Sequence, residues 1–134
     1  NLLDKSNTLG INMENILIAS ADRNQVPELL KLANLGIFFI QPAYSKKASS
    51  AVKMGEMMAM GLRFVTNKGV GDADILVEKY KSGTLVDINS LESPDLSNLF
   101  CTNNEEMMRK TSEIYFSLTK GIASYSDAYK VCLA

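Results

Sequence analysis

The chain has 134 residues, of which 46% are hydrophobic and 22% are charged, and its net charge is -1. These values are ordinary for one globular domain, and they give no overall electrostatic attraction to nucleic acid or to an anionic membrane. Histidine is absent, which excludes an imidazole base, a Ser-His nucleophile pair and a His-ligated zinc site. Any chemistry must therefore use carboxylates, lysines, hydroxyls or backbone amides.

Cysteine usage and hydropathy favour a cytoplasmic protein. Cys101 and Cys132 lie far apart in the sequence and form no metal or redox motif, so we interpret them as reduced thiols. No apolar run approaches the roughly 18 to 20 residues of a membrane-spanning helix. The start of the chain lacks the layout of a signal peptide. We expect no metal, no cofactor, no nucleic-acid partner and no transmembrane segment.

Short apolar runs recur along the first two thirds of the chain, and each has the pattern of a buried strand. These runs are residues 15–19, 36–40, 63–66 and 84–87. An amphipathic stretch with helical spacing fills each gap between them. These stretches are residues 26–34, 45–61 and 72–83. Pro27 suits the first turn of the first stretch, and Gly83 is a plausible stop for the last.

Strict alternation of strand and helix predicts an α/β fold, with a Rossmann-like parallel sheet covered by helices on both faces. Right-handed crossovers would make that sheet doubly wound. From residue 105 the pattern is helical only, over 105–121 and 124–134, with Asn103 or Asn104 as a cap. We expect one domain over residues 1–134, with an α/β core at about 15–90. A helical C-terminal extension at about 104–134 would pack back over the sheet.

In open parallel sheets, ligands bind outside the carboxyl ends of the strands, beside the first turns of the helices that follow. The loops after the expected strands are therefore the candidate site segments. They are residues 20–25, 41–50, 67–73 and 87–90.

Residues 45–61, SKKASSAVKMGEMMAMG, carry the strongest chemical signal. A helix capped by Ser49 or Ser50 would place Lys53 and Glu56 on one face, and Met54 and Met58 on the buried face opposite. Surface helices usually carry an acid in the first turn, where the amide dipoles leave about half a positive charge. This segment has none there and adds lysines instead.

Two interpretations of the positive charge at the start of this expected helix remain open. A phosphate or diphosphate could neutralise it, with Lys46, Lys47 and the exposed backbone amides as partners. Alternatively, the lysines are simply solvated and the serines only cap the helix. Glu56 is equally open from pattern alone: its carboxylate could pair with Lys53, or it could accept two hydrogen bonds from a ribose diol.

Residues 26–87 resemble the nucleotide-sugar-binding, C-terminal domain of a GT-B glycosyltransferase. They are similar to the glycogen-synthase-like retaining group, found widely in bacterial polysaccharide synthesis, whose pattern reads x-x-G-E-x-M-A-x-G-x-P-V. Gly55-Glu56, Met58-Ala59 and Gly61 fit that register, and Val65 lies one residue beyond the valine position. The resemblance covers roughly residues 15–90 and implies a partial domain of that fold.

Carried over by position, the resemblance implies a set of donor contacts. Glu56 would bind the ribose hydroxyls of the sugar nucleotide. The loop at residues 21–26, including Arg23, would lie beside the base. Tyr44 and Ser45 would line the approach to the sugar. The diphosphate would rest near Ser49, Ser50, Ala51, Val52, Lys53 and Lys47.

Departures from the family pattern limit what the resemblance implies. Ala48 stands where many members carry an acid that contacts the donor sugar, and Arg63 replaces the usual proline. The chain also lacks an acceptor-binding domain and the early strands that bring an arginine and a lysine to the phosphates. We therefore expect a fragment that is inactive alone, with no catalytic residue assigned.

Two functions remain in competition at this point. The chain would be the donor-binding half of a cytoplasmic glycosyltransferase that moves a sugar from a nucleoside-diphosphate sugar to an acceptor hydroxyl. Its partners would be the nucleotide sugar and the missing N-terminal domain, and peripheral membrane contact of the full enzyme stays open. The alternative is a non-catalytic GT-B-like binding or scaffold domain.

Overall fold

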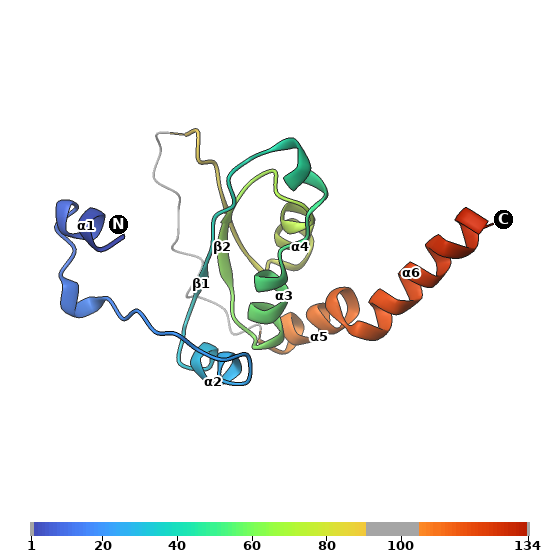
Figure 1. The fold of residues 1–134 in the computed structure, drawn as a ribbon, viewed down its shortest axis with the longest axis horizontal. Helices are drawn as coiled ribbons and strands as arrows, with labels where there is room; N and C mark the ends of the chain where they lie inside the picture. The colour runs from blue at the N-terminus through green and yellow to red at the C-terminus, as the bar shows by residue number, and fades with distance from the viewer. Residues whose placement is uncertain (1, 91–104, 134) are drawn as a thin grey trace.

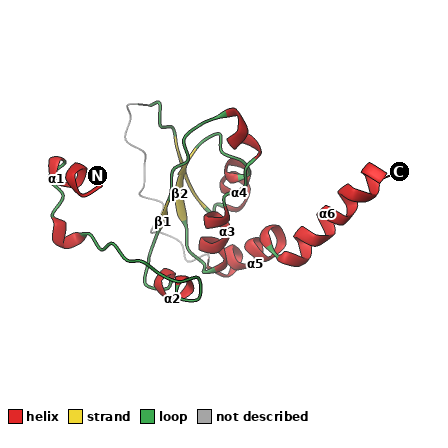
Figure 2. Cartoon of the chain, viewed as in Figure 1, coloured by secondary structure: helices red, strands yellow, loops and turns green. Residues whose placement is uncertain are grey.

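The computed structural model describes residues 2–90 and 105–133, and all statements below concern these residues. Three parallel strands form one sheet in the order β1-β2-β3 (Figures 1 and 2). They are β1 (Gly36–Ile37), β2 (Phe64–Asn67) and β3 (Gly83–Val86). Phe64 of β2 pairs with Gly36 on one side and with Gly83 on the other. The expectation of an α/β fold with a parallel sheet is confirmed.

The expected strand at residues 15–19 is wrong. The short helix η1 (Met13–Asn15) ends inside it, and the rest joins no sheet. Leu17 is 88% exposed and Ile18 is 63% exposed. A strand is stable only with a neighbour that pairs its backbone groups, and no described strand pairs with this segment. The described strand order never reverses, so this part of the sheet is not doubly wound.

Two helices make the crossovers between the strands and build the core. α3 (Val52–Ala59) joins β1 to β2, and α4 (Ala73–Tyr80) joins β2 to β3. Their inward side chains meet the aromatic residues of the sheet in one cluster. It contains Phe38, Met54, Met58, Phe64, Ala73, Leu76 and Val77. Met54 and Met58 are 1% and 0% exposed, as the helical spacing predicted.

Because one cluster holds residues of both helices, α3 and α4 cover the same face of the sheet (Figure 1). Strand side chains alternate between the faces, and Ile37 and Phe39, on either side of Phe38 in the chain, are 63% and 54% exposed. The expected helical cover of both faces is thus not seen in the described part of the chain.

Gly83 has a different role from the expected helix stop. α4 ends at Tyr80, and Lys81 follows in the left-handed conformation with φ 53°. Gly83 instead opens β3, where an added Cβ would overlap the carbonyl oxygen of Phe64. Only glycine allows the two strands to approach this closely.

α5 (Glu105–Phe116) packs against α3 rather than directly on the sheet. The Ser112 Oγ donates a buried 3.0 Å hydrogen bond to the Gly55 carbonyl. The ring of Phe116 covers Gly55 so closely that a Cβ there would lie 2.9 Å from the ring. The hydroxyls of Tyr115 and Tyr80, 3.0 Å apart, join α5 to α4. The expected caps at Asn103 and Asn104 lie outside the described residues.

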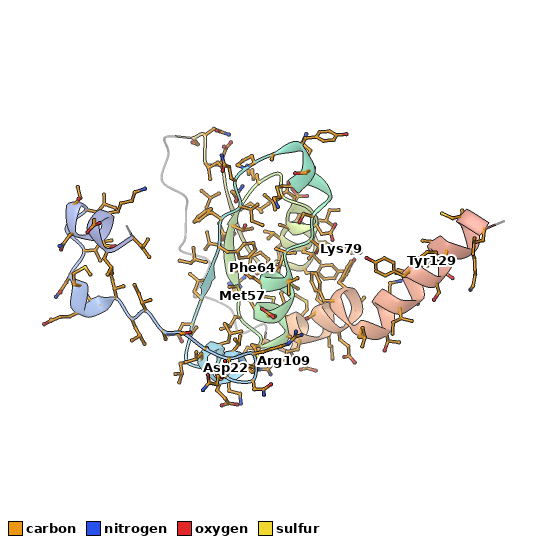
Figure 3. All side chains as sticks on the ribbon, in the orientation of Figure 1. Asp22, Met57, Phe64, Lys79, Arg109 and Tyr129 are labelled. Atoms are coloured by element: carbon orange, nitrogen blue, oxygen red, sulfur yellow. The ribbon has the colours of Figure 1, made fainter. Side chains whose placement is uncertain are left out.

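α6 (Leu118–Leu133) contradicts the expected packing of the C-terminal helices over the sheet. It projects away from the rest of the molecule, carries Tyr129 far from Phe64 (Figures 1 and 3), and buries none of its residues. The break between the two helices also falls earlier than expected, at Ser117. The Ser117 hydroxyl accepts a 3.3 Å hydrogen bond from the Lys120 amide, a capping contact that favours a new helix start.

The described residues before β1 form helices and loops and contribute no strand to the sheet. α1 (Leu2–Thr8) lies apart from the sheet, whereas α2 (Val26–Leu30) lies beside the C-terminal end of α3 (Figure 1). Pro27 stands in the first turn of α2 as predicted, although the helix is shorter than the expected 26–34. The described helices include none that combines the length and the apolar character needed to cross a membrane.

Candidate functional site

The loops after β1 and β2 interlock at the carboxyl edge of the sheet. The Gly71 amide donates a 3.2 Å hydrogen bond to the Lys46 carbonyl, which also accepts from the Ser49 amide at 3.3 Å. Gly71 has φ +49°, and an added Cβ would overlap the backbone carbonyl of Ser49. The structure gives Gly71 a packing role against the lysine-rich loop.

Asn67 fixes the base of the same loop. Its side chain is 0% exposed, accepts a 2.9 Å hydrogen bond from the Ile40 amide and donates a 3.0 Å hydrogen bond to the Ile40 carbonyl. These two contacts extend the pairing of β1 with β2 beyond the short strand β1. Sequence reasoning placed Asn67 in a candidate loop but did not single it out. Its signal was a polar residue at the end of a buried strand.

The start of α3 differs from the expected serine cap. The lysines and Ala48 belong to a separate helical turn, η2 (Tyr44–Ala48), and the N-cap of α3 is Ala51, with no side-chain hydrogen bond to the helix. Ser49 and Ser50 lie between η2 and α3, and the helix begins only after Ala51, which has extended backbone angles of φ -79° and ψ 111°. The first turn also holds no acid. Its amides therefore lack the side-chain partner that a capped helix has.

A cavity of about 220 Å³ opens at this end of α3. Lys53 lines it together with Ala51 and Val52 of the helix start. The apolar part of its lining comes from Phe38, Phe39 and Ile40, which directly follow β1. Three of the residues expected near a diphosphate thus lie in one cavity, and the side chains of Lys46 and Lys47 are exposed on the turn before it.

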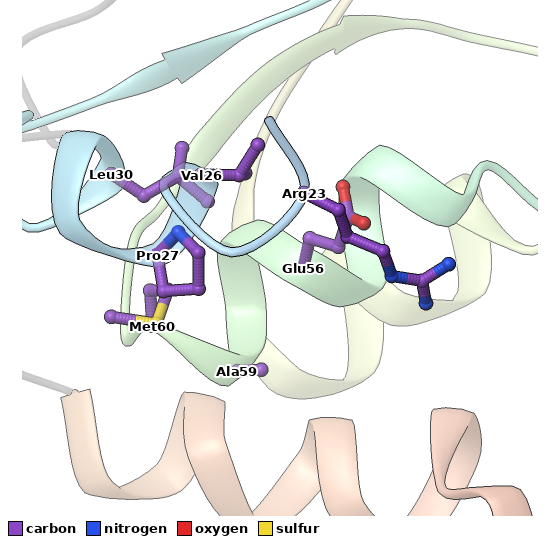
Figure 4. A pocket seen from close by; sticks show the side chains of 7 residues that line it. All are labelled: Arg23, Val26, Pro27, Leu30, Glu56, Ala59 and Met60. Atoms are coloured by element: carbon purple, nitrogen blue, oxygen red, sulfur yellow. The ribbon is translucent and has the colours of Figure 1, made fainter. Parts of the chain in front are cut away.

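A second cavity, of about 210 Å³, lies between α2 and the later part of α3 (Figure 4). Arg23 and Glu56 lie next to each other at one end of it. The other end is apolar and is formed by Val26, Pro27, Leu30 and Met60. Leu30 and Met60 line this cavity but were not among the expected site residues, because their apolar character looked only like core.

The structure therefore divides the expected site residues into two groups along α3. One group surrounds the helix start, and the other places Glu56 and Arg23 in one cavity nearer the helix end. The loop at residues 20–25 does not join the other loops at the carboxyl edge, since the strand expected before it does not form. Tyr44 and Ser45 are exposed on η2, and Tyr44 is 91% exposed.

Side chains outside these cavities, on α4 and α5, have shifted pKa values. The hydrogen bond from Tyr115 and the nearby Lys79 lower the pKa of Tyr80. Lys110 lowers the pKa of Glu106 through a hydrogen bond and its charge. The first contact joins α4 to α5, and the second is an exposed ion pair within α5, so neither lies at the candidate site. The residues that the structure describes contain no group of three acidic or cysteine side chains arranged to hold a metal ion.

Comparisons with protein-family models, with curated proteins and with solved structures gave no match to this chain.

Proposed function

We propose that this chain is the donor-binding part of a retaining glycosyltransferase, which presents a nucleoside-diphosphate sugar to an acceptor hydroxyl. One observation carries the proposal. Glu56, to which the family resemblance gives the ribose, and Arg23, in the loop to which it gives the base, line the same cavity. These residues are far apart in the sequence, and the sequence pattern did not require them to meet.

The helix start supports the placement of the diphosphate. Ala51 supplies no capping side chain, the first turn carries no acid, and Lys53 lines the adjoining cavity. A helix end in this state keeps its partial positive charge of about 0.5 available to an anion. In a transfer reaction the same groups would stabilise the charge that develops on the departing diphosphate.

A donor-binding domain does not by itself perform transfer. The acceptor site would come from the rest of the enzyme, and no residue of this chain is assigned to catalysis. Ala48 stands where related enzymes carry an acid for the donor sugar. This substitution favours a second candidate, a GT-B-like domain that binds the donor without transferring the sugar.

Calorimetric titration with nucleoside diphosphates tests the proposal. Glu56→Gln should weaken binding about tenfold or more, because charge-assisted hydrogen bonds to a diol become neutral ones. Glu78→Gln is the matched control, since Glu78 is an exposed glutamate on α4. The proposal fails if no nucleoside diphosphate binds, or if the two variants bind equally well. A sugar-transfer assay of the parent enzyme then separates the two candidates, because the binding-module candidate predicts donor binding without transfer.

A further inference from the structure

We infer that Asn67 is a positioning residue of the candidate site, which holds the lysine-rich turn η2 beside the start of α3 so that the diphosphate can make its contacts there. This inference rests on the proposed function, because it takes the ligand to be a nucleoside diphosphate. It goes further, because it makes the binding of the phosphates depend on a buried side chain that does not itself touch the ligand.

Asn67 joins the end of β1 to β2 through its side chain. The Phe38 amide still donates a 3.1 Å hydrogen bond to the Val65 carbonyl, as in a parallel ladder. Two residues further on, the Asn67 Oδ1 accepts a 2.9 Å hydrogen bond from the Ile40 amide, and the Nδ2 donates a 3.0 Å hydrogen bond to the Ile40 carbonyl. A side chain thus stands where a backbone pair would otherwise form. The two chains therefore diverge here, and the loop after β1 leaves the sheet from Ile40.

A second hydrogen bond ties the same loop to the segment that Asn67 begins. The Gly71 amide donates to the Lys46 carbonyl at 3.2 Å. Residues 67–71 therefore hold the loop at two points, Ile40 before η2 and Lys46 within it. Loss of the Asn67 side chain removes the first of these ties and leaves the turn free to shift about the second.

The loop that Asn67 holds forms part of the phosphate end of the site. Ile40 lines the cavity at the start of α3 together with Lys53, and the side chains of Lys46 and Lys47 are exposed on η2. Asn67 is 0% exposed, so it can act on a ligand only through Ile40 and the turn that follows. A buried amide is stable only when it is hydrogen-bonded, and the Ile40 backbone supplies these partners. The same two contacts thus satisfy Asn67 and fix the position of the loop.

The test is a calorimetric titration of the whole chain with inorganic diphosphate and with ADP, GDP, UDP and CDP. Asn67→Ala should weaken the binding of inorganic diphosphate about tenfold, which is the effect of losing one charge-assisted hydrogen bond. Val77→Ala is the control for lost stability, because Val77 is buried in the core cluster and belongs to neither loop. It should leave this affinity unchanged. Asn67→Ser is the second variant if Asn67→Ala does not fold, since its shorter side chain cannot replace both hydrogen bonds, and circular dichroism checks each fold.

A double-mutant cycle separates positioning from a general loss of structure. Its ligand is whichever of the four nucleoside diphosphates binds most tightly. When Asn67→Ala is combined with Lys47→Ala, the affinity should fall by less than the product of the two separate factors, because both changes remove contacts to the same phosphates. When it is combined with Glu56→Gln, the factors should multiply, because Glu56 lies in the other cavity.

The outcomes separate this inference from the proposed function. The inference is overturned if Asn67→Ala and Val77→Ala have equal effects, or if the factors multiply in both cycles. It is also overturned if a nucleoside diphosphate binds and inorganic diphosphate does not. In each of these cases the proposed function stands, because it is tested by the effect of Glu56→Gln. If no nucleoside diphosphate binds, the inference and the proposed function both fail.

Discussion

Replacing Gly71 with alanine should loosen the carboxyl edge of the sheet. Two costs add at this position. A side chain in the left-handed region costs about 1–2 kcal/mol, and the new Cβ would overlap the Ser49 carbonyl. Relief of that overlap must move the two loops apart and break the Gly71–Lys46 hydrogen bond, which contributes about 1 kcal/mol. We expect Gly71→Ala to lower the free energy of unfolding by about 2–3 kcal/mol, or roughly 10 °C in Tm.

Gly69 supplies the matched control for this substitution. It has φ +76°, close to that of a left-handed residue, but nothing lies within 4 Å of the position of its Cβ. Gly69→Ala should therefore cost only the backbone strain, about 1–2 kcal/mol, without the further loss of the hydrogen bond. Thermal unfolding followed by circular dichroism measures both variants. Equal losses of stability would show that Gly71 does not hold the two loops together, and the reasoning would be refuted.

Other substitutions test single features of the fold. Asn67→Ala should cost about 1–3 kcal/mol, because it leaves the Ile40 backbone groups unpaired, and hydrogen exchange at the Ile40 amide should accelerate. Met58→Ala should cost about 2–5 kcal/mol in urea unfolding, since Met58 is 0% exposed, whereas Val52→Ala, at a position that is 74% exposed, should cost much less. Gly121→Ala should raise the helical signal of α6, since no atom lies within 4 Å of the new Cβ and alanine favours a helix by about 1 kcal/mol.

The sequence predicted an element correctly where residues that are close together in the sequence determine its structure. Short apolar runs identified β2 and β3, and helical spacing identified α4 and the buried face of α3, because each of these signals depends on residues that are close in sequence. Residues 15–19 had the same apolar pattern and still failed. A strand is stable only when it pairs with a neighbouring strand, and its own residues do not show which segment that neighbour is.

The same distinction explains what could be predicted of the site. Lys53 and Glu56 share one helix, so their spacing alone placed both on the exposed side of α3. The interlocking of Gly71 with Ser49, and the meeting of Arg23 with Glu56, join segments that are distant in the sequence. Sequence periodicity cannot predict such contacts, because the two segments meet only when the backbone is folded.

The two ends of the candidate site consequently depend on different parts of the fold. The positive end depends on the loops at the carboxyl edge, which the Asn67 side chain and the Gly71 amide hold in place through hydrogen bonds to the loop backbone. The cavity with Arg23 and Glu56 depends on α2, which follows the segment that forms no strand. Under the proposed function, a change that displaces α2 should therefore weaken the contacts to the nucleoside and leave the contacts to phosphate intact. A change at Gly71 should do the reverse, because the loop that it touches carries the lysines.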